Sequence, residues 1–470
     1  MKDSTQPFPA HPRRYTHVDI DRTEIERGYM LWPNTAKRDE HGDLTVGGVS
    51  VARIAEAVGT PVYIYDESTI RSQCRAFRDG LSRGGAPGVV TYAAKAWLSR
   101  ALVEILVEEE MNIDVVSGGE LYVALESGMP PERISFHGNS KSRFELQMAI
   151  EAGVGTIVVD NFDEIDRLYE LSVEAEAPIP VMLRINPGID AHTHDYRKTG
   201  IVDSKFGLGV QSGDAARAVA RLLDNDGLEM LGFHAHIGSQ IFETETFTAS
   251  VDAVVGFAAA MRDQFGYQPR KISPGGGFGI VHSESEESPP PAEYAEAVAE
   301  AFITAVAEAG FDAIPALVIE PGRSIVGNAG IAVYRVDARK VIPGVRTYVS
   351  VDGGMADNIR PALYGAVYSA ELVAEGNVEA PAHRITLAGK FCESGDILIQ
   401  DAELPDVKLD DLIAVPAAGA YCLAMASNYN MAPRPAVVMV SNGQARLVQK
   451  RETYRDLMSR DVEGIQDLSV

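Results

Sequence analysis

Between residues 89 and 320 the sequence repeats one pattern, a short apolar run followed by a longer amphipathic stretch. The apolar runs have the length and β-branched content of strands, and they cover residues 89–94, 112–116, 134–137, 155–160, 180–186, 230–236, 271–275 and 316–320. Helical periodicity marks the stretches between them, as in 100–110, 119–127, 142–152, 162–175, 214–223, 246–264 and 292–309. Alternation of this kind predicts a parallel sheet, and eight units in about 230 residues favour a closed (β/α)8 barrel. An open, doubly wound parallel sheet is the alternative.

The pattern changes after about residue 330, where short β-rich runs are separated by turns. These runs predict an all-β domain and cover residues 331–338, 347–351, 383–387, 412–415, 436–440 and 445–449. The early apolar run 62–65 precedes the barrel pattern, and we expect its strand to join the β domain. We therefore expect an N-terminal segment over residues 1–65, a barrel over 66–328 and a β domain over 329–470. The first 45 residues are polar and irregular, and the acidic, proline-rich segment 283–291 is expected to form a surface loop.

Polar side chains follow the predicted barrel strands at their carboxyl ends, where the site of a (β/α)8 barrel lies. They are Lys95, Asp114, His137, Asn139, Asp160, Asn161, Arg184, Asn186, His234, His236 and Glu320. Solvation alone would scatter such residues over both ends of the strands. We therefore expect a site at this rim.

The charge balance excludes some classes of partner. The chain carries 67 acidic and 42 basic residues, a net charge of −25, which argues against nucleic acid or an anionic membrane. The three cysteines show no paired spacing, so neither a disulfide framework nor a zinc site is expected. We find no apolar signal core and no run of about 20 apolar residues. A cytoplasmic protein is the expectation.

Lys95 follows the first predicted barrel strand, between the small residues Ala94 and Ala96. We expect this amine to be poorly solvated, and burial of a lysine lowers its pKa and favours the neutral form. A neutral amine forms a Schiff base with a carbonyl or with pyridoxal phosphate. The alternative is an ordinary lysine at a strand end that extends to water.

Two segments have the chemistry of a cofactor site. The glycines 275–277 follow the seventh strand, where backbone N–H groups can approach a phosphate, although a flexible turn would look the same. At the end of the sixth strand, His236 is placed to stack on a flat ring and Ser239 to donate to a phosphate. His234 shares the strand face of His236, so a metal pair is conceivable. We prefer stacking because no third ligand is evident.

Three further motifs carry charge or a thiol. Glu320 ends the eighth strand, where a carboxylate would hold a pyridinium nitrogen protonated, and Arg323 offers a planar fork for a carboxylate or phosphate. An ion pair between these two residues is the alternative. Arg360 and Tyr364 lie close together in the β domain. Cys392 stands beside two carboxylates and is either a proton donor or a small buried apolar residue.

Eight ordered motifs resemble the fold-type III pyridoxal-phosphate-dependent decarboxylases, and among them those that act on diaminopimelate. They are YAAK at 92–95, DVVSGGE at 114–120, SKFG at 204–207, HIGS at 236–239, GGG at 275–277, EPGR at 320–323, CESGD at 392–396 and SNYN at 427–430. The resemblance implies that Lys95 binds the cofactor, pyridoxal 5'-phosphate, covalently and that Cys392 is the proton donor. It implies cofactor contacts for Lys95, Asp114, His236, Ser239, Gly276, Gly277, Glu320, Gly322, Arg323 and Tyr421. It implies substrate contacts for Arg323, Arg360, Tyr364, Glu393 and Tyr421, and no metal.

The implied reaction converts meso-2,6-diaminopimelate to L-lysine and carbon dioxide in a homodimer, with residues 392–396 reaching the partner's site. The pair Arg360 and Glu393 suits the zwitterionic far end of that substrate. Alternatives are a decarboxylase for a D-amino acid or a carboxynorspermidine-like substrate, and a catalytically silent relative, which would need neither Lys95 nor Cys392. The chain departs from the family at Ser273-Pro274, where proline removes an amide donor, and at Cys422, where the family has glycine.

Overall fold

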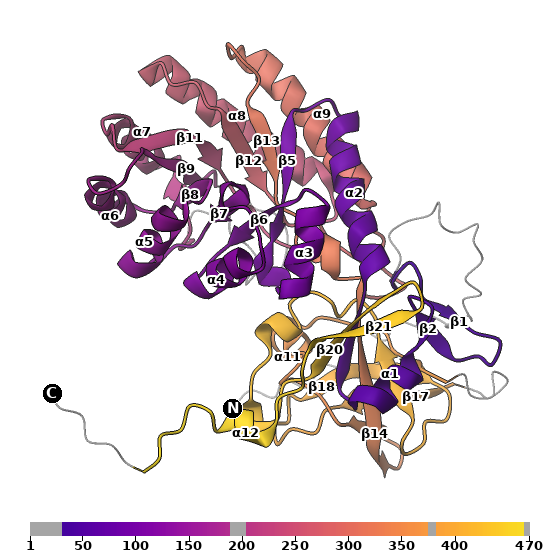
Figure 1. The fold of residues 1–470 in the computed structure, drawn as a ribbon. Coiled ribbons are helices and arrows are strands. Elements are labelled where there is room, and N and C mark those ends of the chain that lie inside the picture. The colour runs from indigo at the N-terminus through magenta and orange to yellow at the C-terminus, as the bar shows by residue number, and fades with distance from the viewer. Residues whose placement is uncertain (1–30, 189–203, 375–381, 465–470) are drawn as a thin grey trace, which may run out of the picture.

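The computed structural model describes residues 31–188, 204–374 and 382–464, in two parts that lie one above the other in Figure 1. The upper part in that view contains a parallel sheet surrounded by helices, and the lower part contains mainly antiparallel strands. Among the helices of the described ranges, none has the length and apolar content that a membrane crossing requires.

Eight parallel strands close into a barrel in the order β9-β11-β12-β13-β5-β6-β7-β8, with β8 pairing back to β9. They are β5 (Gly88–Ala93), β6 (Asn112–Val115), β7 (Ile134–Phe136), β8 (Thr156–Val159), β9 (Ile179–Asn186), β11 (Leu228–His234), β12 (Lys271–Gly275) and β13 (Ala316–Ile319). A two-residue strand, β10 (Leu208–Gly209), extends β9. The prediction of a closed barrel is confirmed, and the open sheet is wrong.

Helices surround the barrel, and the seven that the sequence predicted lie within three residues of their expected ends. They are α3 (Arg100–Glu108), α4 (Gly118–Glu126), α5 (Arg143–Ala152), α6 (Phe162–Ser172), α7 (Asp214–Leu223), α8 (Thr244–Phe265) and α9 (Pro291–Ala309). Only the four-residue α10 (Arg323–Val326) follows β13. An unpredicted helix that precedes β5, α2 (Glu67–Arg83), packs against α9 and completes the ring.

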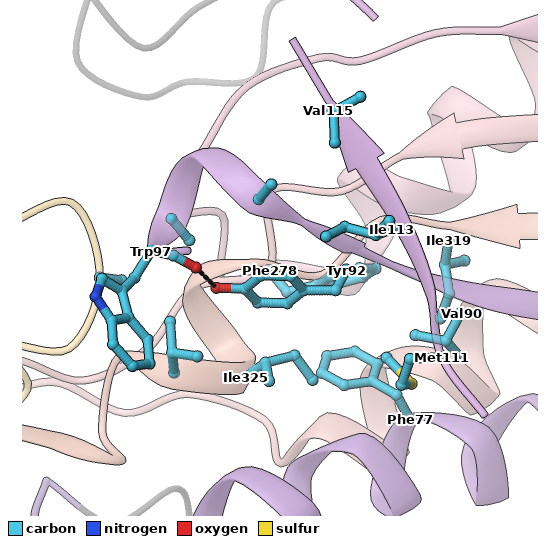
Figure 2. Close-up of a cluster of buried hydrophobic side chains, with 14 of the residues drawn as sticks. Phe77, Val90, Tyr92, Trp97, Met111, Ile113, Val115, Phe278, Ile319 and Ile325 are labelled. Atoms are coloured by element: carbon cyan, nitrogen blue, oxygen red, sulfur yellow. Dashed lines mark hydrogen bonds between the residues drawn. The ribbon is translucent and has the colours of Figure 1, made fainter. Parts of the chain in front are cut away.

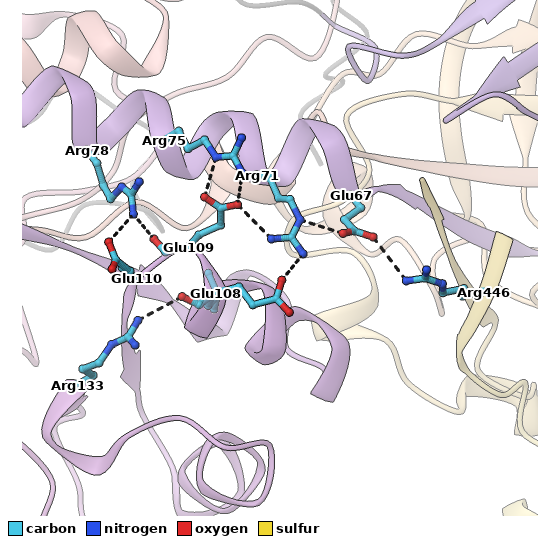
Figure 3. Close-up of polar contacts among 10 residues, drawn as sticks. Glu67, Arg71, Arg75, Arg78, Glu108, Glu109, Glu110, Arg133 and Arg446 are labelled. Atoms are coloured by element: carbon cyan, nitrogen blue, oxygen red, sulfur yellow. Dashed lines mark hydrogen bonds and ion pairs between the residues drawn. The ribbon is translucent and has the colours of Figure 1, made fainter. Parts of the chain in front are cut away.

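The polar face of α2 is bound to the end of α3 by a network of ion pairs, which Figure 3 shows. Arg71 contacts Glu108 at 2.6 Å and Glu109 at 3.1 Å, and Arg75 contacts Glu109 at 2.7 Å. Burial alone would raise the pKa of Glu109, but hydrogen bonds from Arg75 and Arg71 lower it. The carboxylate therefore remains charged and ties the two helices together.

The apolar face of α2 contributes to the core beside the first strand (Figure 2). Phe77 of α2 and Tyr92 of β5 are fully buried there, and Phe278 from the loop after β12 joins them. The Tyr92 hydroxyl donates to Trp97 O at 2.7 Å. This bond fixes the turn that carries residue 95 against the core.

The β domain is built around the long strand β14 (Gly330–Ile342). This strand pairs with β4 (Val62–Asp66), β15 (Arg346–Val351) and β19 (Leu412–Val415). Strand β4 also pairs with β20 in parallel, so an early segment of the chain lies in the middle of this sheet. The other predicted strands are β15 (Arg346–Val351), β17 (His383–Ala388), β19 (Leu412–Val415), β20 (Ala436–Ser441) and β21 (Gln444–Gln449).

Several elements of this part were not predicted. Strand β18 (Ile397–Leu404) pairs with β17, and β16 (Glu371–Leu372) pairs with β19. Part of the segment expected to be irregular forms a small sheet of β1 (Lys37–Arg38), β2 (Leu44–Val46) and β3 (Val49–Ser50). The amphipathic segment that follows is helix α1 (Val51–Val58), and its N-cap Ser50 accepts a hydrogen bond from Arg53 N.

Candidate active site

Lys95 lies in a short 3-10 turn, Ala94–Ala96, directly after β5. Its side chain is exposed, so the expectation of a poorly solvated amine is wrong for this structure. Lys95 instead borders a cavity of 660 Å³ that Glu120 of the barrel and Tyr421 of the β domain also line. The amine is therefore accessible at the rim, between the two parts of the molecule.

Two carboxyl groups with raised pKa values lie near this amine. Asp114 of β6 is 4% exposed, and burial raises its pKa well above the ordinary value, against the opposing charge of Lys95. Glu120 lies in the first turn of α4, where it accepts a hydrogen bond from Val116 N at 2.7 Å. Burial raises its pKa too, again opposed by Lys95. Both groups are suited to hold a proton close to the lysine.

Glu320, directly after β13, is 8% exposed and lies between two buried histidines. His234 Nε2 is 2.9 Å from Glu320 Oε2, and His137 Nε2 is 3.9 Å from Oε1. Burial alone would raise the pKa of Glu320, but the two imidazoles lower it, while burial lowers the pKa of His137. The result is an anionic carboxylate that receives bonds from its surroundings. Glu320 is thus paired with His234, not with Arg323.

Ser273 connects this carboxylate to the glycine loop. Its hydroxyl donates to Glu320 Oε1 at 2.9 Å and accepts from Gly275 N at 3.1 Å. The register of β12 with β13 shifts between Ile272 and Gly275, as expected where Pro274 has no N–H to donate. At Ser273-Pro274, where the chain departs from the family, proline removes an amide donor, but Ser273 supplies a hydrogen bond to the Glu320 carboxylate.

His236 lies at the same rim but has a different partner from His234. Its Nδ1 is 3.2 Å from Gly276 N, so the ring accepts this bond. Burial lowers the pKa of His236 well below its ordinary value, with a further contribution from the charge of Lys95. The ring is a neutral, flat imidazole, the form that suits stacking. The two histidines that sequence reasoning considered as a metal pair therefore have different partners in the structure.

The glycine loop and the start of α10 bring backbone close together. A Cβ atom at position 276 would lie 1.9 Å from Glu320 O, and one at 277, where φ is +109°, would lie 2.4 Å from Gly238 O. At Gly322 the nearest atom would be Ala93 Cβ, at 2.8 Å. Only glycine fits these places, because any side chain would meet neighbouring backbone or Ala93.

A cation is held beside that loop. Arg323, the first residue of α10, is 7% exposed, and its Nη2 donates to Ser239 Oγ at 3.0 Å. Its guanidinium lies over the Tyr421 ring, 4.6 Å from the centroid. Tyr421 has a φ of +60°, and its N–H donates to Ala96 O at 2.8 Å. The structure therefore brings Ser239, Arg323 and Tyr421 together next to the turn that carries Lys95.

Arg360 begins α11 (Arg360–Tyr364) in the β domain and is 2% exposed. Its Nη1 lies 3.0 Å from His282 Nε2 and donates to the Tyr368 hydroxyl. Tyr364 ends the same short helix and is half-buried. Sequence reasoning missed His282 and Tyr368, because nothing in the local pattern of either residue indicates a contact with a guanidinium so far along the chain.

The segment that carries Cys392 and Glu393 is exposed. Cys392 N donates to Asn430 Oδ1 at 3.0 Å, and Glu393 accepts from Gly395 N at 3.3 Å. Asp396 is buried and accepts from Met355 N and Phe391 N, which shapes the loop. Within the described ranges, no hydrogen bond or ion pair of Cys392 or Glu393 is made with the barrel rim or with Arg360.

Comparison with known proteins shows relatives over most of the chain. A family model for the pyridoxal-binding domain of pyridoxal-dependent decarboxylases matches residues 67–327. A diaminopimelate decarboxylase of Bacillus subtilis is 48% identical over 435 residues, which are 92% of this chain and 98% of the relative. One from Mycobacterium tuberculosis is 43% identical over 441 residues, 92% of this chain and 98% of the relative.

Solved structures have the same architecture. A diaminopimelate decarboxylase from M. jannaschii, in complex with L-lysine, superimposes with a TM-score of 0.87 at 32% identity and covers 93% of this chain and 99% of its own. A lysine/ornithine decarboxylase from Vibrio vulnificus, complexed with putrescine, has a TM-score of 0.70 at 19% identity, over 83% of this chain and 97% of its own. The second likeness concerns the fold alone.

Proposed function

The chain belongs to the diaminopimelate decarboxylases, a family of pyridoxal-phosphate-dependent amino-acid decarboxylases, and from that premise we propose which of its residues carry the reaction. The reaction converts meso-2,6-diaminopimelate into L-lysine and carbon dioxide, the last step of lysine biosynthesis. Pyridoxal 5'-phosphate, when bound, supplies the electron sink that receives the electrons left by carbon dioxide. The observation that carries the assignment is an accessible Lys95 on the same rim as an anionic, buried Glu320.

The donors at the rim fit the charge and shape of that cofactor. Gly276 and Gly277 let the loop pack closely against Glu320 and Gly238, and Ser239 and Arg323 add a hydroxyl and a cation beside the loop. A glycine loop after the seventh strand is where barrels commonly hold phosphate. We propose that these residues, with Gly322 and Tyr421, hold the phosphate. In an acidic chain of net charge −25, such a local donor set is what retains an anion.

Glu320 would face the ring nitrogen. Its lowered pKa keeps the carboxylate charged, and a carboxylate at that nitrogen holds the nitrogen's proton in place. His234 and Ser273 donate to the two carboxylate oxygens and fix its orientation. His137, His234 and Glu320 have ligand atoms within 4.8 Å of one another, but we assign the carboxylate to the ring and expect no metal.

The amine of Lys95 is the group that would bind the cofactor and release it to the substrate's amine. Asp114 and Glu120, with pKa values raised by burial, would take up and return protons beside this amine. His236 presents a neutral imidazole to the flat ring. The exposed position of Lys95 suits this exchange, because an amine that is repeatedly displaced must move.

We propose that the far end of the substrate is recognised by Arg360, Tyr364 and Glu393, and that Arg323 and Tyr421 also contact the substrate. Arg360 is a buried cation, and its guanidinium contacts His282 and Tyr368, neither of which carries a carboxylate. Such a cation suits a carboxylate of the substrate. Glu393 would bind the distal ammonium group. Cys392 would give a proton to the carbon that has lost carbon dioxide.

Cys392 and Glu393 are exposed in the single chain, so we propose a homodimer in which each copy completes the other's site. The three cysteines are free, which fits a reducing compartment, and we propose the cytoplasm as the location. The acidic surface argues against nucleic acid as a partner.

The covalent role of Lys95 is tested by absorbance. Purified protein should show the band of covalently bound pyridoxal phosphate, and Lys95→Ala should abolish it because the amine is gone. Lys450→Ala is the matched control, since Lys450 lines the same cavity, and it should keep the band. A Lys95→Ala variant with an unchanged spectrum would contradict the assignment.

The substrate is tested by release of carbon dioxide from meso-diaminopimelate, D-lysine, L-lysine, arginine and ornithine. We expect release from meso-diaminopimelate far above the others, because only that substrate combines a carboxylate and an ammonium group at its far end. Faster release from D-lysine, or from a diamine-forming substrate, would overturn the substrate and keep the cofactor chemistry.

A further inference from the structure

The guanidinium of Arg360 contacts His282, which lies in the segment after β12. His282 is 4% exposed and Arg360 is 2% exposed, so the contact of 3.0 Å between His282 Nε2 and Arg360 Nη1 is shielded from water. The two residues come from different parts of the molecule. The contact therefore joins the barrel to the first residue of α11.

The chemistry of this contact fixes its direction. A guanidinium only donates, so His282 Nε2 accepts this bond from Arg360. Tyr368 contacts both partners, because its hydroxyl accepts from Arg360 and its ring lies 5.5 Å from the His282 ring at 90°.

An anion faces the other ring nitrogen. Glu286 Oε2 lies 3.8 Å from His282 Nδ1 and accepts from His282 N at 2.6 Å. Gln240 Nε2 is 3.2 Å from the same nitrogen, and this amide also donates to Ile280 O. Glu286 and Gln240 therefore hold His282 from the side opposite Arg360.

We propose that His282 is a positioning residue that sets the Arg360 guanidinium for the distal carboxylate of the substrate. The proposal rests on the substrate role proposed for Arg360. His282 directly precedes segment 283–291, which the sequence indicated only as an acidic surface loop, and Glu286 of that segment accepts a hydrogen bond from His282 N.

Steady-state kinetics of His282→Ala and His282→Gln test the positioning role on the holoenzyme. Alanine removes the acceptor, so KM for meso-diaminopimelate should rise about tenfold, the effect of one charge-assisted hydrogen bond, while kcat and cofactor content stay near wild type. Glutamine supplies a carbonyl acceptor and should restore KM to within about threefold of wild type. An unchanged KM in His282→Ala, or no rescue by glutamine, would overturn the proposal.

Arg360→Lys distinguishes a failure of this inference from a failure of the proposed function. If Arg360→Lys raises KM for meso-diaminopimelate and His282→Ala does not, Arg360 is the clamp and His282 does not position it. If neither variant changes KM, the substrate role of Arg360 is wrong, and the inference falls with it. If both raise KM and the double variant raises it no further than Arg360→Lys alone, the two residues act as one unit, as proposed.

Discussion

Glu320 keeps its charge in a buried position because a donor contacts each of its two carboxylate oxygens. His234 and Ser273 donate to its two oxygens at 2.9 Å each, and His137 lies at 3.9 Å. A buried carboxylate without such partners would take up a proton. The lowered pKa of Glu320 is therefore a property of the three strands β11, β12 and β13 acting together, not of the residue alone.

Glu320→Gln should bind pyridoxal phosphate and turn over at least about 100-fold more slowly, because the amide keeps the shape but cannot hold a proton on the ring nitrogen. Ser273→Ala is the control, since it removes one hydrogen bond to the carboxylate but leaves its charge, and we expect a loss below about tenfold. Cofactor content and kcat are measured together. Equal losses in the two variants would show that orientation of the carboxylate matters more than its charge.

The sequence predicted which residues stand on the rim but not how they pair. Lys95, His236 and Glu320 were expected there because each follows a strand, and they lie there. The expected burial of Lys95 was wrong, since a strand end says nothing about the cavity beside it. The bond between His234 and Glu320 spans 86 residues, and such a contact depends on the closure of the barrel, which local pattern does not encode.

At the scale of single elements, the packing of helix α2 on helix α9 depends on small residues. A Cβ at Gly80 would lie 2.3 Å from Ala292 O and 2.7 Å from Ala295 Cβ, and one at Gly84 would lie 2.5 Å from Ala299 Cβ. The two helices therefore approach closely along one face. The sequence held a signal for α2 that sequence reasoning missed, because Ile70, Cys74, Phe77 and Leu81 have helical spacing and are buried.

Gly80→Ala should lower stability by about 1–3 kcal/mol, because the added methyl group meets backbone that cannot move away without separating α2 from α9. Gly256→Ala is the matched control: Gly256 also lies in a helix, but a Cβ there would meet nothing within 4 Å. That substitution should raise stability by about 0.5–1 kcal/mol through helix propensity. Thermal unfolding midpoints of the two variants give the comparison, and a loss in both would point to the helix backbone and not to the packing.

Most strands of the β domain were predicted, but β16 and β18 were not. The eight barrel strands are buried on both faces and stand out as continuous apolar runs. Strand β18 has exposed Gln400 and Asp401 in its middle, so its sequence lacks that signal, and it is ordered by pairing with β17. The same holds for the small sheet β1–β3, which is held by its partners more than by its composition.

At the scale of the whole molecule, the residues proposed for the site lie in two places. Lys95, Glu320 and Arg323 gather at the barrel rim, whereas Cys392 and Glu393 are exposed on a loop shaped by Asp396. A proton donor that acts on a carbon held at the rim must come close to that carbon. A second copy that places its own Cys392 loop over the rim satisfies this requirement, and two-fold symmetry then completes both sites at once.

Mixing Lys95→Ala with Cys392→Ala tests this arrangement, because each variant alone should have almost no activity. If each site uses Lys95 of one copy and Cys392 of the other, a mixed dimer has one native site and one site with both defects. Random exchange makes half of the dimers mixed, so activity should recover to about a quarter of wild type. Differently tagged chains, followed by native mass spectrometry, establish that exchange has occurred. Exchange without recovery would show that each chain supplies both residues to its own site, and the shared site would be wrong.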